Sequence, residues 1–209
     1  MNENIVKRNE KLAAKIIKGL ESRNMTGYYA ATAEEAKELA LSLIPEGSTV
    51  TNGGVTSAHE IGLIDALKEG NYNYVDRDTA DDKQAAALSA YTADFFLTSA
   101  NAITEDGMII NIDGNSNRVS AIAFGPKKVL FIVGMNKVAK DETAALYRAR
   151  NVAAPINAIR VGVHTPCTET GSCADCKSPD TICCQFLTTR YSRHDDRIHV
   201  ILVGESLGF

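Results

Sequence analysis

The chain has 209 residues, of which 44% are hydrophobic and 23% are charged, and its formal net charge is −4 at pH 7. A mildly acidic chain excludes a global electrostatic attraction to nucleic acid or to an anionic membrane. No apolar run reaches the roughly 20 residues that span a bilayer, and residues 1–18 lack the apolar core of a signal peptide. We therefore expect one cytoplasmic domain over residues 1–209.

Helical and extended patterns alternate along the first half of the chain. Residues 5–20 carry apolar side chains at helical spacing, and a second helix begins at Thr32, which forms a capping box with Glu35. The elements expected in this half are helices over 5–20, 32–43 and 79–91, a helix that follows Gly54 and runs through 61–67, and strands over 27–31, 48–51 and 72–75.

The second half continues this alternation. We expect strands over 94–98, 128–133 and 198–203, helices through 119–123 and over 141–150, and an extended segment over 108–112 that forms half of a hairpin. Residues 128–133 are continuously apolar after the first, which is typical of a strand buried on both faces of a parallel sheet. The pattern predicts a Rossmann-like, three-layer α/β domain with a mostly parallel sheet.

Ligands of such sheets bind beyond the carboxyl ends of the strands, so the loops at those ends are candidate sites. In the first loop, Gly53 and Gly54 let backbone N–H groups approach an anion, and Thr56 and Ser57 add hydroxyl donors. The structural alternative is a tight turn in which Ser57 caps the next helix and Glu60 completes a capping box.

The second loop, residues 99–107, is rich in polar side chains, among them Ser99 and Asn101. Its two carboxylates are Glu105 and Asp106. We interpret Asp106 with Gly107 as a turn dipeptide, and Glu105 as a candidate catalytic carboxylate.

The third loop, residues 111–118, contains Asn115, Asn117 and Arg118 just ahead of a helix. An arginine in the first turn opposes the helix dipole, so we expect an anionic ligand there, bound in a bidentate manner. The alternative is a solvated turn capped by Ser116. Lys137, which follows strand 128–133, is a further candidate for anion binding, although a surface lysine is the commoner case.

All five cysteines lie within segment 164–185. In a reducing compartment such clustering favours metal binding over disulfides. Cys173 and Cys176 form a C-x2-C pair that can hold one metal, and Cys167 with either Cys183 or Cys184 completes four ligands. The spacing leaves an iron–sulfur cluster, a zinc ion and a metal-free loop of thiols as alternatives.

Five ordered stretches resemble the LUD domain family, which includes lactate-utilisation protein C. They read GGVTSAHEIGL, ITEDGMIINIDGNSNRVSA, VGMNKV, PINAIR and HVILVGESLGF. The resemblance implies a fold similar to ribose-5-phosphate isomerase, glucosamine-6-phosphate deaminase and the CoA-transferases. It also implies that the loop around Gly53 holds a phosphate or CoA segment, and that Glu105 is the nearest counterpart of the CoA-transferase nucleophile.

Three functions follow as hypotheses. The first is an accessory or redox protein of lactate or 2-hydroxy-acid utilisation that binds a small organic anion, carries an iron–sulfur centre and works with iron–sulfur oxidoreductase subunits. The second is a stand-alone enzyme that acts on a phosphorylated sugar or an acyl-CoA through Glu105. The third is a non-catalytic ligand-binding module. Each is compatible with a homo-oligomer.

Overall fold

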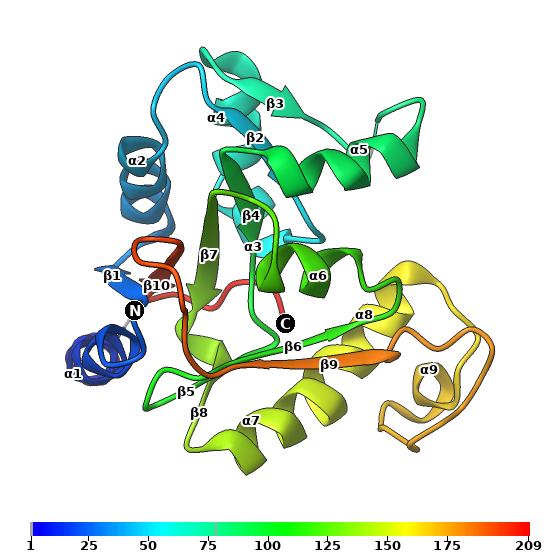
Figure 1. Cartoon of the computed structure of the whole chain (residues 1–209). Helices are drawn as coiled ribbons and strands as arrows, with labels where there is room; N and C mark the ends of the chain where they lie inside the picture. Colours follow the sequence, from blue (N-terminus) through cyan, green and yellow to red (C-terminus); the bar gives the residue numbers. More distant parts are fainter. Residues whose placement is uncertain (1, 78) are drawn as a thin grey trace.

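The computed structural model describes residues 2–77 and 79–209, and it alternates helices with strands along most of the chain (Figure 1). The helices are α1 Glu3–Glu21, α2 Ala33–Leu43, α3 Thr56–Glu60, α4 Leu63–Glu69, α5 Lys83–Ser89, α6 Asn117–Ala123, α7 Glu142–Arg148, α8 Ala154–Val161 and α9 Pro166–Thr170. The strands are β1 Thr26–Ala30, β2 Thr49–Asn52, β3 Asn73–Val75, β4 Phe95–Thr98, β5 Ala102–Thr104, β6 Ile109–Asp113, β7 Lys128–Gly134, β8 Val138–Ala139, β9 Gln185–Thr189 and β10 Ile198–Val203.

The larger sheet has six strands in the order β1-β10-β7-β4-β2-β3, and each neighbouring pair is parallel. Strand β7 is buried at every position after Lys128, as its apolar run predicts. Parallel strands need such burial because their crossover helices cover both faces of the sheet.

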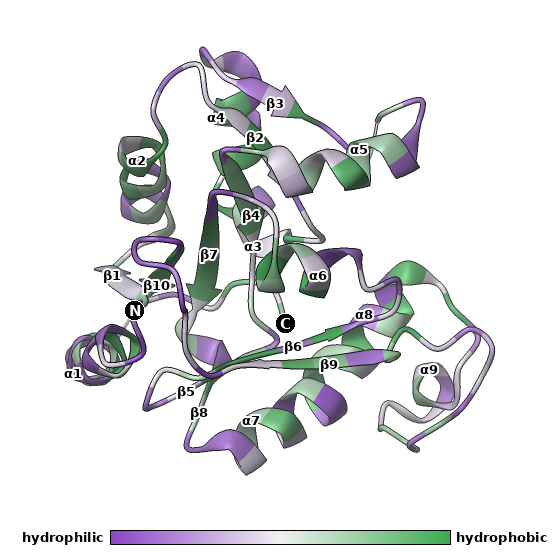
Figure 2. Cartoon of the chain, in the orientation of Figure 1, coloured by the Kyte–Doolittle hydropathy of each residue, from purple (hydrophilic) through white to green (hydrophobic). Residues whose placement is uncertain are grey.

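Apolar side chains on the two faces of this sheet form two cores. One core packs α2, α3 and α4 against β2, β4, β7 and β10. The other packs α1 and α6 against the opposite face, and the strands between these helices are predominantly apolar (Figure 2). This arrangement of helices on both faces of a mostly parallel sheet confirms the predicted Rossmann-like three-layer α/β fold.

A second, four-stranded sheet has the order β8-β5-β6-β9. Strand β6 pairs antiparallel with β5, so the extended segment at 108–112 is half of a hairpin, as predicted. The sequence did not predict the rest of this sheet, because β5 and β8 have only three and two residues and carry no readable period. One face of the four-stranded sheet packs on α7 (Figure 1).

Three predicted helices differ at their boundaries. The helix expected after Gly54 and through 61–67 is divided into α3 and α4, because Gly62 adopts φ 72° between them. The helix expected from residue 79 begins at Lys83, because the Asp82 side chain caps it. The helix expected over 141–150 continues through a π-helical turn, Ala149–Ala153, into α8. Over 2–77 and 79–209, no helix is both long and apolar enough to cross a membrane.

Two glycines fix the position of α1 on the β5–β6 turn. A Cβ atom on Gly19 would lie 2.4 Å from the backbone carbonyl of Asp106, and one on Gly107 would lie 2.6 Å from the backbone nitrogen of Leu20. Both contacts involve backbone atoms, so a side chain at either position must displace the helix or the turn.

We expect Gly19→Ala to lower the free energy of unfolding by about 1–3 kcal/mol because of this overpacking. The same change in an unobstructed helix raises the free energy of unfolding by about 1 kcal/mol. The sign of the change therefore shows whether α1 lies against the turn. Urea denaturation measures the difference, with the exposed Lys18→Ala as a control expected to stay within about 0.5 kcal/mol of the wild type. A more stable Gly19→Ala variant would contradict the close approach of α1 to the turn.

Candidate functional site

A cavity of about 460 Å³ opens at the carboxyl ends of β2, β4 and β7. Strand β4 lies between β2 and β7 in the sheet, so the loops that follow these three strands meet at one edge. They contribute Gly54 and Thr56, Ser99 and Asn101, and Lys137 to the wall. The structure therefore brings together the polar loops that the sequence placed at strand ends.

The rest of the wall comes from segments far apart in the sequence. The turn between β6 and α6 contributes Asp113, Asn115, Asn117 and Arg118. Helix α8 contributes Arg160, and the cysteine segment contributes residues 179–182. Of the candidate anion-binding residues, only Gly53 and Ser57 do not line the cavity. Gly53 lies against Arg118, and Ser57 is hydrogen-bonded to Lys137.

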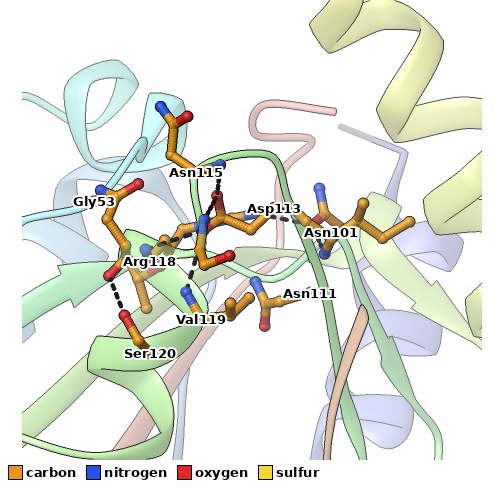
Figure 3. Close-up of polar contacts among 12 residues, drawn as sticks. Gly53, Asn101, Asn111, Asp113, Asn115, Arg118, Val119 and Ser120 are labelled. Carbon is orange, nitrogen blue, oxygen red and sulfur yellow. Dashed lines mark hydrogen bonds and ion pairs between the residues drawn. The ribbon is translucent and has the colours of Figure 1, made fainter. Parts of the chain in front are cut away.

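Arg118 ties the edge of one sheet to the end of the other (Figure 3). Its guanidinium donates to the carbonyl oxygens of Ser99 at 3.3 Å and Ile112 at 2.6 Å, and to Oδ1 of Asn101 at 3.0 Å. Its Nε lies 3.8 Å from the Asp113 carboxylate. Burial lowers the pKa of Arg118, and the neighbouring Asp113 opposes that shift. Much of the hydrogen-bonding capacity of this arginine is thus used within the protein.

The Asp113 carboxylate occupies the amino terminus of α6. One oxygen accepts from the backbone N–H groups of Asn115 and Ser116, and the other from those of Arg118 and Val119, at 3.0–3.1 Å. At this helix end the chain itself therefore supplies a negative charge. Ser116 is the N-cap residue of α6, but it has φ 65° and its side chain makes no cap hydrogen bond. Asp113 was not singled out from the sequence, although the turn-forming sequence Asp-Gly-Asn is a signal that could have identified it.

The two adjacent glycines have different surroundings. A Cβ atom on Gly53 would lie 2.9 Å from Cγ of Arg118 and 3.0 Å from Cζ of Phe96. A Cβ atom on Gly54 would meet nothing within 4 Å, and Gly54 lines the cavity. Gly53 therefore has to be a glycine for Arg118 and Phe96 to pack against it. Gly54 is open to the cavity.

Lys137 lines the main cavity and is buried, with 3% of its surface exposed. This excludes the alternative of a surface lysine. Its Nζ donates to Oγ of Ser57 at 3.1 Å and to Oγ of Ser99 at 3.0 Å. Within the described ranges, no carboxylate lies within ion-pair distance of this ammonium group.

The surroundings of Lys137 disfavour its charged form. Burial, followed by the positive charges of Arg148 and Arg118, lowers its pKa to about 7, and Glu60 opposes the shift. An amine with this pKa holds both protonation states near neutral pH, so it can bind an anion as ammonium or exchange a proton with it.

Ser57 has a role different from the predicted helix cap. Val55 is the N-cap residue of α3, so Ser57 belongs to the first turn of the helix. The Ser57 hydroxyl accepts a hydrogen bond from Lys137. Glu60 does not complete a capping box, because its carboxylate accepts the backbone N–H of Gly208 at 2.6 Å. The sequence contained no signal for this pairing, since Ser57 and Lys137 are 80 residues apart.

Glu105 does not line this cavity. Its carboxylate accepts from Nζ of Lys15 at 2.5 Å and from Nζ of Lys140 at 2.9 Å, beside α1. The hydrogen bonds from these two lysines lower the pKa of Glu105. The structure thus separates Glu105 from the other candidate residues.

Four cysteines line a second cavity of about 70 Å³ at the edge of the molecule. They are Cys167, Cys173, Cys176 and Cys183, whereas Cys184 is exposed and outside this cavity. Burial, and then the negative charges of the other thiols, raise the pKa of Cys183 to about 11. In the part of the chain that the structure describes, no three His, Cys, Asp or Glu side chains are placed to hold a metal ion.

Arg160 and residues 179–182 are parts of the main cavity that sequence reasoning missed. The Arg160 guanidinium lies 6.0 Å from the ring of Phe209, which also lines the cavity. The cations of the lining are Arg77, Arg118, Lys137 and Arg160, and its acids are Asp113 and Asp180. This excess of positive charge suits an anionic ligand.

The fold and the cavity define an α/β protein with a polar cavity at the carboxyl edge of a parallel sheet. The model of the LUD domain family matches residues 13–203 of this chain. The chain therefore belongs to the LUD domain family, as its sequence stretches predicted.

A solved structure has a similar fold. The crystal structure of a DUF162 family protein from Deinococcus radiodurans is similar over 93% of this chain and 98% of that chain, with a TM-score of 0.54 and 12% sequence identity. At this identity the likeness concerns the fold. No curated protein matches the sequence.

The two glycines of the first loop give a matched pair of variants. We expect Gly53→Ala to lower the free energy of unfolding by about 1–3 kcal/mol, because the new methyl group displaces Arg118 or Phe96. We expect Gly54→Ala to stay within about 0.5 kcal/mol of the wild type. Chemical denaturation of both variants measures the difference, and equal losses would contradict the distinct surroundings of the two glycines.

Proposed function

We propose that this protein binds a small organic anion of the 2-hydroxy-acid or 2-oxo-acid type in the main cavity, as a component of lactate utilisation. The LUD domain family is associated with lactate utilisation. The observation that carries the proposal is Lys137, a buried amine that lines the cavity without a carboxylate partner among the described residues.

A buried charge is costly unless a counter-ion and hydrogen bonds compensate it. The hydroxyl groups of Ser57 and Ser99 accept hydrogen bonds from Lys137 but carry no negative charge. The carboxylate of a ligand supplies the missing charge. Its second polar group, a hydroxyl or a carbonyl oxygen, has Thr56, Asn115 and Asn117 along the wall as hydrogen-bonding partners.

The size of the cavity agrees with this ligand class. Small-molecule sites measure about 300–1,000 Å³, and a cavity of about 460 Å³ holds a short carboxylic acid with water. The alternative enzyme of phosphorylated sugars or acyl-CoA relied on Glu105 as the catalytic carboxylate. That group is bound to Lys15 and Lys140 outside the cavity, which favours the carboxylate-binding proposal.

The proposal predicts that binding weakens as the pH rises through about 7. The ammonium form of Lys137 binds the anion, and its pKa of about 7 in the free protein rises when the ligand is bound. Above pH 7 the dissociation constant for L-lactate or pyruvate should therefore increase by about tenfold per pH unit. Isothermal titration calorimetry from about pH 6 to about pH 9 measures the slope, and affinity that is independent of pH would contradict it.

A second prediction uses Lys137→Met, with Lys140→Met as the matched control at an exposed lysine. We expect Lys137→Met to weaken carboxylate binding at least about thirtyfold, equivalent to about 2 kcal/mol or more. Lys140→Met should bind like the wild type. Retained affinity in Lys137→Met, or binding of ribose 5-phosphate or CoA in place of the carboxylates, would overturn the proposal.

The same variant should be more stable than the wild type at neutral pH. Lys137 titrates at about 7 when folded and at about 10.4 when unfolded, so the unfolded chain binds the proton more tightly. The resulting penalty on the folded state is complete below pH 7 and disappears as the pH rises to about 10.4. Denaturation of both proteins at pH 7 and at about pH 10 should show the stability advantage of Lys137→Met shrinking. Loss of binding without loss of folding then separates a site defect from misfolding.

A further inference from the structure

The cavity of about 70 Å³ beside α9 is built around sulfur. Its wall includes four thiols contributed by three stretches of the cysteine segment: Cys167 from α9, Cys173 and Cys176 from the loop after it, and Cys183 from the approach to β9. All four are half-buried and free. The adjacent Cys184 faces solvent, so the structure distinguishes the two cysteines that the sequence left as alternatives.

Two of the thiols already have the hydrogen-bonding partners that thiolate ligands have in metal sites. Sγ of Cys173 accepts from Nη2 of Arg150 at 3.7 Å and from the backbone N–H of Asp175 at 3.5 Å. Sγ of Cys167 lies 3.2 Å from Oγ1 of Thr165. Donors of this kind stabilise the negative charge on ligating sulfur. Arg150 is further held by an ion pair to Asp175.

The space between the thiols favours a cluster over a single ion. Four sulfurs around one zinc ion, each at about 2.3 Å, must approach within about 4 Å of one another. The four thiols surround a space of about 70 Å³, which is several times the 10–15 Å³ or so that one water molecule requires. Iron and sulfide atoms at the centre of a cluster fill such a space and keep the ligands apart.

We propose that Cys167, Cys173, Cys176 and Cys183 bind an iron–sulfur cluster, and that this cluster fixes one wall of the anion-binding cavity. Cysteine thiolates are the usual ligands of such clusters, and four of them complete a [2Fe–2S] or [4Fe–4S] centre. The coupling rests on the proposed function of the main cavity, whereas cluster binding does not.

The two cavities share a wall. Thr181 and Ile182, which precede Cys183, line both of them. This stretch is also fastened to the turn that contains Asp113, since the backbone N–H of Cys184 donates to the Asp113 carbonyl at 3.0 Å. A Cβ atom on Gly114 would lie 3.1 Å from Cα of Ile182, so the two backbones are in contact. Ligation of Cys183 therefore restrains the residues that close the anion site.

The test compares Cys176→Ser with the matched control Cys184→Ser. The full-length proteins are purified without oxygen, supplied with ferric iron, sulfide and a thiol reductant, and analysed for iron, acid-labile sulfide and visible absorption. We expect the wild type and Cys184→Ser to be brown and to contain iron and sulfide in equal amounts. Cys176→Ser should lose at least about tenfold in iron affinity, and Cys167→Ser tests the same site from α9 if the first variant does not fold.

The coupling is measured on the wild type with and without its cluster, by calorimetric titration of L-lactate. Removal of the cluster with a chelator should raise the dissociation constant by about fivefold or more. Wild-type protein that takes up no iron, or that binds zinc alone, overturns the cluster, as does full iron content in Cys176→Ser. An unchanged lactate affinity after cluster removal overturns the coupling and leaves the anion site standing. Absence of lactate binding in the iron-loaded wild type overturns the proposed function instead.

Discussion

The position of the main cavity depends on the interaction between Arg118 and Asp113. Arg118 donates hydrogen bonds to groups at the ends of both β4 and β6, and Asp113 binds the backbone N–H groups at the start of α6. These bonds join the large parallel sheet to the small mixed sheet at one point. The loop after β4 is also joined to β6 by hydrogen bonds from the Asn111 amide to the Ser99 carbonyl and from the Ile112 N–H to Oδ1 of Asn101. Because the groups are buried, each unmade bond would leave an uncompensated polar group.

Lys137 differs from Arg118 in that no carboxylate among the described residues compensates its charge. Arg118 is compensated by carbonyl oxygens and a carboxylate, whereas Lys137 is held only by two hydroxyl groups and lies near two further cations. Such a residue costs the folded state free energy at neutral pH, and proteins commonly place such strain where function requires it. In our proposal, a carboxylate ligand supplies the charge that the chain does not.

The cysteine segment links two features that are separate in the sequence. It carries the four thiols, and its residues 179–182 also line one side of the main cavity. An iron–sulfur cluster on these thiols would therefore sit next to the bound organic anion in a protein whose family is associated with lactate utilisation. In our proposal, the cluster restrains the wall that the two cavities share.

The sequence alone determined the layered α/β architecture, the family, and the loops that meet at the cavity. Apolar periods of two and 3.6 residues are local, and the carboxyl ends of neighbouring parallel strands must lie at one edge, so this part of the site follows from the pattern. Only the tertiary structure decided which groups meet. It paired Lys137 with Ser57 and Ser99 and placed the Asp113 carboxylate at the start of α6. It also placed Glu105 beside α1, outside the main cavity, and Cys183 rather than Cys184 in the wall of the small cavity. These outcomes depend on contacts between residues tens of positions apart, and such contacts arise from the packing of whole elements and leave no local sequence pattern.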